Sequence, residues 1–69
     1  MTLAAATDLV TDLIELGAQE ISIDSLNLVE DNWSLSIYDI HTEDKLAITQ
    51  LFMDMHIAYH PFDYGIYAS

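Results

Sequence analysis

The sequence predicts a single small α+β domain over residues 1–69, ordered as helix, β-hairpin, helix and a short final strand. Three patterns support this fold class. The chain opens with an amphipathic helical pattern, continues with alternating apolar and polar residues around a turn signal, and then shows a second helical pattern. Because each element has one apolar face, both helices are expected to pack on one face of a small antiparallel sheet. No linker or internal repeat is evident.

The first helix is expected over residues 2–16. Thr2 is a suitable N-cap, the alanines that follow favour a helix, and Gly17 stands where a glycine commonly ends one. Apolar residues at helical spacing predict the buried face. They are Leu9, Leu13 and Leu16, with Val10 and Ile14 widening the stripe.

The hairpin is expected over residues 26–40, with Asp31 and Asn32 as a two-residue turn, because both residue types tolerate positive φ. This turn pairs apolar residues with apolar residues and small polar residues with small polar ones. The expected pairs include Glu30 with Trp33, Leu28 with Leu35 and Leu26 with Ile37. In the second strand, Leu35 and Ile37 are expected to point inward, and Ser34 and Ser36 outward.

The first strand, expected over residues 20–30, changes its alternation part-way. Ile21 and Ile23 have one parity, whereas Leu26 and Leu28 have the other. One extra residue at Asp24–Ser25 brings both apolar pairs to the same face of the sheet. A β-bulge is therefore expected there.

The second helix is expected to begin with Thr42 as its N-cap. Glu43 and Asp44 then fall in the first turn, where the helix dipole favours anions. An apolar stripe follows at helical spacing and predicts the buried face. Its members are Ile48, Leu51, Phe52 and Met55.

The end of this helix is open to two interpretations. The pattern favours a helix that continues to Tyr59, but an earlier end near Asp54 is an alternative, because residues 55–59 also alternate as a strand would. Pro61 stops the helix in either case. Residues 62–68 alternate again and predict a short edge strand or an aromatic tail.

The charge balance limits the partners that the protein can bind. Twelve carboxylates stand against one basic side chain, Lys45, and the formal net charge is −11. Self-repulsion on this scale destabilises a compact chain, and solubility needs a net charge of only about 2–8 for a small domain. Direct contact with nucleic acid or with an anionic membrane is not expected, because both need Lys or Arg. The expected partners are basic proteins or cations.

Other features exclude several classes of function. The chain has no cysteine, which excludes disulfides and thiolate metal sites. Neither a signal-peptide core nor a membrane-length apolar run is present, so a cytoplasmic location is expected, in the host cytoplasm for a phage-encoded protein. Glycine-rich phosphate loops and EF-hand spacing are absent. Neither an enzyme nor a cofactor site is expected.

Two short motifs invite a more specific interpretation. His56 and His60 lie four residues apart, as two zinc ligands on one helix face do, but Ile57 stands where a metalloprotease motif has glutamate. Two surface histidines and no metal site are expected. Asp24-Ser25-Leu26, followed by Val29-Glu30, resembles the phosphopantetheine attachment motif of acyl carrier proteins, which implies modification of Ser25. In that family the serine opens a long helix, whereas here the turn signal follows after about two turns.

The leading hypothesis is a small acidic inhibitor that occupies a basic, nucleic-acid-binding surface of another protein. In composition the chain resembles phage-encoded DNA mimics and anti-CRISPR or anti-restriction inhibitors, and this resemblance implies such a target. The carboxylates expected to bind it lie on the first helix, at the hairpin turn and at the second helix start: Asp8, Asp12, Glu15, Glu30, Asp31, Glu43 and Asp44. The aromatic residues Trp33, Tyr64 and Tyr67 match interface composition and join them.

The alternative is a structural or adaptor subunit that forms a homodimer through apolar and aromatic surface, with acidity serving solubility alone. Apolar residues make up 52% of a chain that is too short to bury them all. Salt distinguishes the two hypotheses, because added salt weakens binding between exposed charges and leaves apolar contacts intact. The acyl-carrier hypothesis ranks third.

Overall fold

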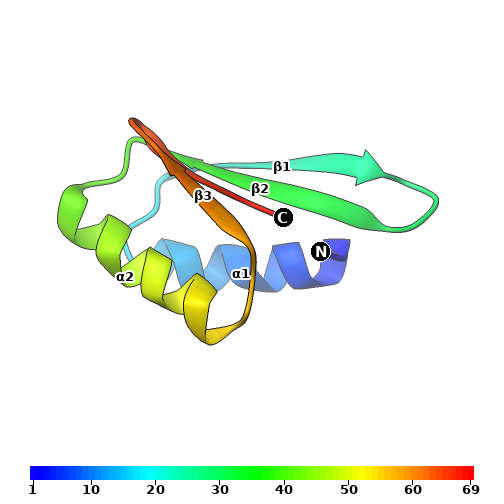
Figure 1. Cartoon of the computed structure of the whole chain (residues 1–69), viewed down its shortest axis with the longest axis horizontal. Helices are drawn as coiled ribbons and strands as arrows, with labels where there is room; N and C mark the ends of the chain where they lie inside the picture. The colour runs from blue at the N-terminus through cyan, green and yellow to red at the C-terminus, as the bar shows by residue number, and fades with distance from the viewer.

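The computed structural model describes Met1 to Ser69 as two helices and one four-stranded antiparallel sheet, in the order α-β-β-α-β-β. The elements are α1 (Leu3–Glu15), β1 (Glu20–Asn27), β2 (Asn32–Tyr38), α2 (Thr42–Asp54), β3 (Tyr59–Phe62) and β4 (Gly65–Ala68). Both helices lie on the same side of the sheet (Figure 1). The predicted α+β class and its arrangement are confirmed. Neither helix is long and apolar enough to cross a membrane.

The sheet has the strand order β1-β2-β4-β3, so the last strand of the chain is central. The short C-terminal strand expected within residues 62–68 is confirmed, but it begins at Gly65, and its expected edge position is wrong. The chain turns at Asp63 and Tyr64, and β4 then pairs with β2 on one side and β3 on the other. Ile66 lies opposite Ile37 and is fully buried, which gives β4 the apolar face that a central strand needs.

Helix α1 begins and ends as the sequence predicts. The Thr2 Oγ1 accepts a hydrogen bond from the Ala5 backbone N–H at 3.1 Å, which is an N-cap. At the other end, the Ala18 N–H donates to the Leu13 carbonyl and Gly17 adopts a φ of +105°. These contacts make a Schellman motif, and glycine adopts its left-handed residue without strain. Ile14, expected to widen the buried stripe, is instead exposed.

The hairpin between β1 and β2 has a different register from the predicted one. Ile21 pairs with Ile37 and Ile23 with Leu35, and the loop has four residues, from 28 to 31. Asn27 explains the longer loop, because its Oδ1 accepts hydrogen bonds from the backbone N–H groups of the second and third residues after it. A bulge is present, but it lies between Ser25 and Asn27 rather than at Asp24–Ser25.

The second helix departs from prediction at both ends. Its N-cap is His41, which makes no side-chain capping bond, and Thr42 is its first residue. The helix ends at Asp54, so the extension to Tyr59 is wrong and the earlier end is confirmed. The chain turns at His56, whose φ is +57°, and this brings the ring of Tyr59 onto the ring of Phe52, with the centroids 6.1 Å apart.

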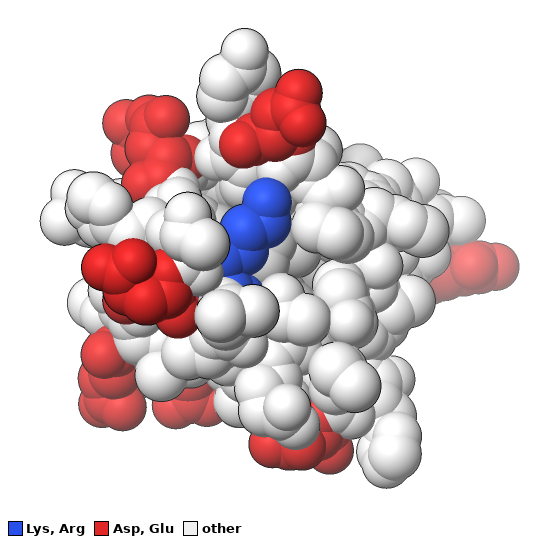
Figure 2. All heavy atoms as spheres, turned by 60° about the vertical axis from the view of Figure 1, so that its left-hand side comes forward, with Lys and Arg blue, Asp and Glu red and all other residues white.

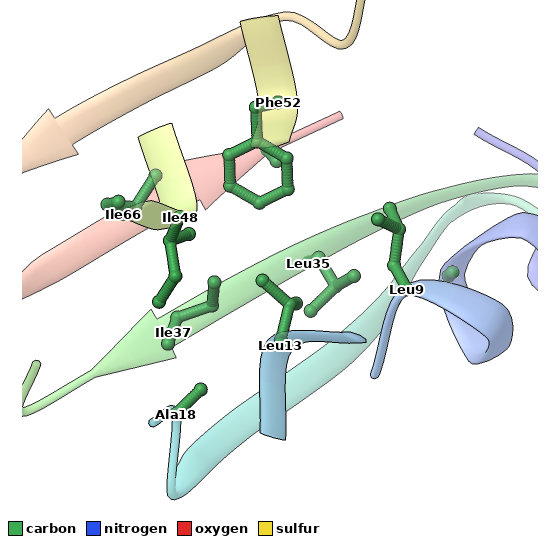
Figure 3. Packing of buried hydrophobic residues seen from close by; sticks show 10 residues of the cluster. Leu9, Leu13, Ala18, Leu35, Ile37, Ile48, Phe52 and Ile66 are labelled. Carbon is green, nitrogen blue, oxygen red and sulfur yellow. The ribbon is translucent and has the colours of Figure 1, made fainter. Parts of the chain in front are cut away.

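The core lies between the helices and the sheet. Figure 3 shows side chains from α1, α2, β2 and β4 converging on one another. The buried apolar residues are Ala6, Leu9, Leu13, Ala18, Leu35, Ile37, Ile48, Phe52, Ile66 and Ala68. The inward direction predicted for Leu35 and Ile37 is confirmed. Ser34 and Ser36 have the opposite parity, as predicted, but they are only 2% and 8% exposed.

Candidate protein-binding surfaces

The first candidate surface is a row of carboxylates on α1. Asp8, Asp12 and Glu15 are all exposed, because Leu9 and Leu13 turn another side of the helix into the core. Their spacing of four and three residues places them on one side of the helix, over about 10 Å of its length. The helix carries no basic residue, so nothing on α1 compensates this charge.

The fold adds a further carboxylate at each end of α1. At the start, the Asp31 Oδ1 accepts hydrogen bonds from the Leu3 backbone N–H at 3.1 Å and from the Trp33 Nε1 at 2.8 Å. At the other end, Asp44 lies so close to Gly17 that a β-carbon there would be 2.6 Å from the Asp44 Oδ2. The α1 acidic row, defined as Asp31, Asp8, Asp12, Glu15 and Asp44, therefore follows about 20 Å of helix.

Asp31 and Trp33 also hold the hairpin in place. Besides the Asp31 contacts, the backbone nitrogen of Met1 donates to the Asn32 Oδ1 and to the Trp33 carbonyl oxygen, and the Trp33 N–H donates to the Met1 carbonyl oxygen. The residues before α1 thus pair with β2 beyond the end of β4. Trp33 is half-buried there. It therefore has a structural role, whereas the sequence predicted only an interface role for it.

The other predicted site residues lie elsewhere. Glu43 is exposed in the first turn of α2, and Glu30 is exposed in the hairpin loop. Tyr64 is exposed in the turn between β3 and β4, where its carbonyl oxygen accepts from the Asp39 N–H at 2.7 Å. Tyr67 is half-buried on the sheet face that the helices leave uncovered. The structure therefore brings the acidic residues of α1 together but not the tyrosines.

Lys45 is the one basic side chain that could offset the carboxylates. Its Nζ donates a hydrogen bond to the Phe62 carbonyl oxygen at 2.7 Å, which ties α2 to the end of β3. In Figure 2 the lysine lies in the middle of one face, and carboxylates surround it in separate groups with uncharged surface between them. The carboxylates on this face therefore do not form one continuous patch around the lysine.

An exposed apolar loop is the feature that sequence reasoning missed. Leu26 and Leu28 were expected to pair with Ile37 and Leu35 across the hairpin, but they are 52% and 73% exposed, and Val29 beside them is 96% exposed. They lie in the hairpin tip (residues 26–31), which projects beyond α1 (Figure 1). The change of alternation between Ile23 and Leu26 was the available signal, since only one of the two apolar pairs can face the core.

The uncovered face of the sheet holds an aromatic pair. Tyr38 and Phe62 meet edge to face across Gly65, with their ring centroids 5.9 Å apart. A β-carbon at Gly65 would collide with the backbone oxygen of Ile37, so the close approach of β4 to β2 requires glycine. This pair was also not anticipated from the sequence.

The structure contains no pocket and no group of three His, Asp or Glu residues placed to hold a metal ion. His56 follows α2 and His60 lies in β3, so the two do not share a helix face. Ser25 lies in β1 opposite Trp33, as the strand prediction required.

Comparison of the chain with models of known protein families, with curated protein sequences and with solved structures found no match. The functional inference therefore rests on the charge and shape of the surfaces described above. Of these, the α1 acidic row has the most clearly defined chemistry, because three of its carboxylates are on α1, one lies at each end of that helix, and α1 carries no basic residue.

Proposed function

We propose that the protein binds a basic surface of another protein, of the kind that binds nucleic acid, and blocks it. The single observation that carries this proposal is the α1 acidic row. Three of its carboxylates are on α1, Asp31 lies at the first helical residue and Asp44 lies beside Gly17, two residues past the last, and no Lys or Arg lies on that helix. Lys and Arg side chains of a target can bind such carboxylates as they bind phosphates.

The electrostatics support a partner that supplies the missing positive charge. The net charge is −11, and the only lysine ammonium donates to a backbone carbonyl. Carboxylates crowded along one helix repel each other and destabilise it. A basic target relieves this repulsion on binding and is attracted over long range, which makes association fast and sensitive to salt.

A binding experiment with matched charge variants tests the proposal. The wild-type chain is immobilised, and basic proteins from a lysate of its source cells are eluted with increasing salt and with added DNA or RNA. The affinity of the captured protein is then measured against the triple variant Asp8→Asn, Asp12→Asn, Glu15→Gln. The control triple, Asp39→Asn, Asp54→Asn, Asp63→Asn, removes the same charge from exposed positions outside the row.

The α1 triple variant is expected to bind about tenfold more weakly. Three exposed ion pairs contribute about 0.5 kcal/mol each, and about 1.4 kcal/mol corresponds to a factor of ten. The control triple is expected to change affinity much less, and nucleic acid is expected to displace the wild-type chain from its target. Equal losses in the two triples, or binding that resists high salt, would contradict the proposal.

A second candidate function has its own observation. The exposed apolar side chains of the hairpin tip favour an adaptor that self-associates through this loop. Sedimentation at high salt tests it, with Leu28→Gln compared against Leu46→Gln. Leu46 is 72% exposed on α2, and Leu28 is 73% exposed, so the two changes are matched in chemistry and exposure. A dimer that only Leu28→Gln dissociates would support the adaptor function.

A further inference from the structure

The two outer strands of the sheet differ in how well their free edges are protected. β3 has only four residues, and one of them is Pro61, which has no N–H to offer a further strand. β1 has eight residues without proline or lysine, and it pairs only with β2. Its bulge lies at the far end, between Ser25 and Asn27. The stretch from Glu20 to Asp24 is therefore a regular, open edge.

The two faces of this stretch have opposite chemistry. Glu20, Ser22 and Asp24 lie opposite Tyr38, Ser36 and Ser34 on the face that the helices leave uncovered. The Ser22 Oγ donates to the Asp24 Oδ2 at 3.3 Å, which holds this carboxylate on that face.

On the helix side, Ile21 and Ile23 are only half-buried. Helix α1 packs against β2, so these two side chains lie at the margin of the core. Apolar surface on this side of β1 remains available to a neighbouring strand.

We infer that the free edge of β1 accepts an extended basic segment of the partner protein as a fifth, antiparallel strand. Backbone hydrogen bonds to β1 would hold this segment, as they do in other cases of strand addition. Residues opposite Glu20 and Asp24 are four apart and share a face, so they are Lys or Arg. Residues opposite Ile21 and Ile23 face the core side and are apolar. The segment has the pattern basic, apolar, any, apolar, basic.

Charge complementarity selects this occupant over a second copy of the chain. A second β1 would bring its own Glu20 and Asp24, together with a net charge of −11, to the same edge. A basic segment instead places opposite charges directly across from each other, where cross-strand pairs stabilise a sheet. The inference rests on the proposed function, because it takes the partner to be basic, and it adds a binding mode at β1 that is separate from α1.

Synthetic peptides of defined sequence test the inference. The probe is a capped nonapeptide, Ser-Thr-Lys-Val-Thr-Val-Lys-Thr-Ser. One control has the same composition with the central order Val-Val-Thr-Lys-Lys, and the other has Glu in place of both Lys. Each is titrated into the full-length, ¹⁵N-labelled chain, and backbone amide shifts and hydrogen-exchange rates are recorded.

The probe is expected to shift and slow exchange of β1 amides while leaving β3 unchanged, and to bind at least tenfold more tightly than either control. Glu20→Gln with Asp24→Asn is expected to weaken the probe about tenfold. Asp54→Asn with Asp63→Asn, an equal loss of charge away from β1, is expected to leave its affinity within about twofold. All four residues are exposed, so the variants are expected to fold.

Three results would overturn the inference. Equal binding of the probe and its reordered control, with shifts along α1, would show charge attraction without strand addition and would leave the proposed function standing. Absence of any β1 shift at millimolar probe would exclude the edge as the site. Shifts of β1 that depend on protein concentration without peptide would assign the edge to self-pairing instead.

Discussion

The chain consists of two α-β-β halves that share an architecture and almost no sequence. Helices α1 and α2 each have 13 residues. Corresponding positions in the two halves are separated by the same number of residues. Leu3 and Thr42 begin the two helices, Glu15 and Asp54 end them, and Gly17 and His56 are the left-handed residues that follow. The strand order places the second strand of each half in the middle of the sheet. Equivalent positions therefore have the same place in the fold but different residue types, so no repeat was evident in the sequence.

The halves differ in how much of their structure is specified locally. α1 has a threonine N-cap and a glycine in its Schellman motif, whereas α2 has His41 and His56 at these positions. In α2 the same motif forms, since the Ile57 N–H donates to the Phe52 carbonyl at 2.9 Å. Standard capping residues allow prediction of α1 from sequence. The ends of α2 depend more on packing, which explains why its boundaries were mispredicted.

The largest expected effect compares the buried anchors of the two halves, Leu13 and Phe52, both fully buried. Phe52→Ala is expected to lower the free energy of unfolding by about 3–5 kcal/mol and Leu13→Ala by about 2–5 kcal/mol, through lost burial and cavities. A domain of this size has about 3–10 kcal/mol in total, so Phe52→Ala is expected to unfold much of the population. Urea titration followed by circular dichroism measures both.

Met53→Ala is the control, because Met53 is an exposed neighbour of Phe52. A loss of stability below about 1 kcal/mol for Phe52→Ala would mean that α2 is not part of the common core.

The next effect concerns the helix ends that differ in residue type. Gly17→Ala is expected to cost about 1–2 kcal/mol, because alanine is strained at a φ of +105° and its β-carbon would meet Asp44. Thermal unfolding measures this loss. Asp44→Ala in the same background separates the two causes, because it removes every side-chain atom that the new β-carbon would meet and leaves the backbone strain. Unchanged stability in Gly17→Ala would show that the two ends tolerate side chains equally.

The two N-caps are expected to respond in opposite directions. Thr2→Ala removes the hydrogen bond to the Ala5 N–H and is expected to cost about 1 kcal/mol. His41→Ser supplies a capping oxygen that α2 lacks and is expected to gain up to about 1 kcal/mol. Urea midpoints of the two variants and of the double variant check this, and the effects are expected to add because the caps are on different helices. A destabilised His41→Ser would indicate that the histidine ring has another structural role.

The smallest expected effect comes from a substitution that gives both Schellman motifs a glycine. His56→Gly is expected to stabilise the protein by about 0.5–1 kcal/mol, because glycine adopts a φ of +57° without the strain of a β-carbon. Differential scanning calorimetry detects such a change as a rise of a few degrees in Tm. His60→Gly, within β3, is the control and is expected to destabilise the strand. A fall in Tm for His56→Gly would contradict the comparison.

The sequence by itself determined the local features of the first half and the chemistry of the surface. Thr2, Gly17 and the Leu9–Leu13 spacing predicted α1 correctly, because capping and helical periodicity depend on residues close together in the chain. The inward parity of Leu35 and Ile37 was correct for the same reason. The carboxylates were correctly identified as abundant and uncompensated, since charge is a property of composition.

Only the tertiary structure decided the hairpin register, the central position of β4 and the placement of acidic residues along α1. Alternation allowed either Ile21 and Ile23 or Leu26 and Leu28 to face the core, and packing selected the isoleucines. Asp31 and Asp44 reach the two ends of α1 from distant parts of the chain, so no local pattern could place them there. Pairing between strands far apart in sequence depends on which surfaces bury best together, and that energy belongs to the assembled core.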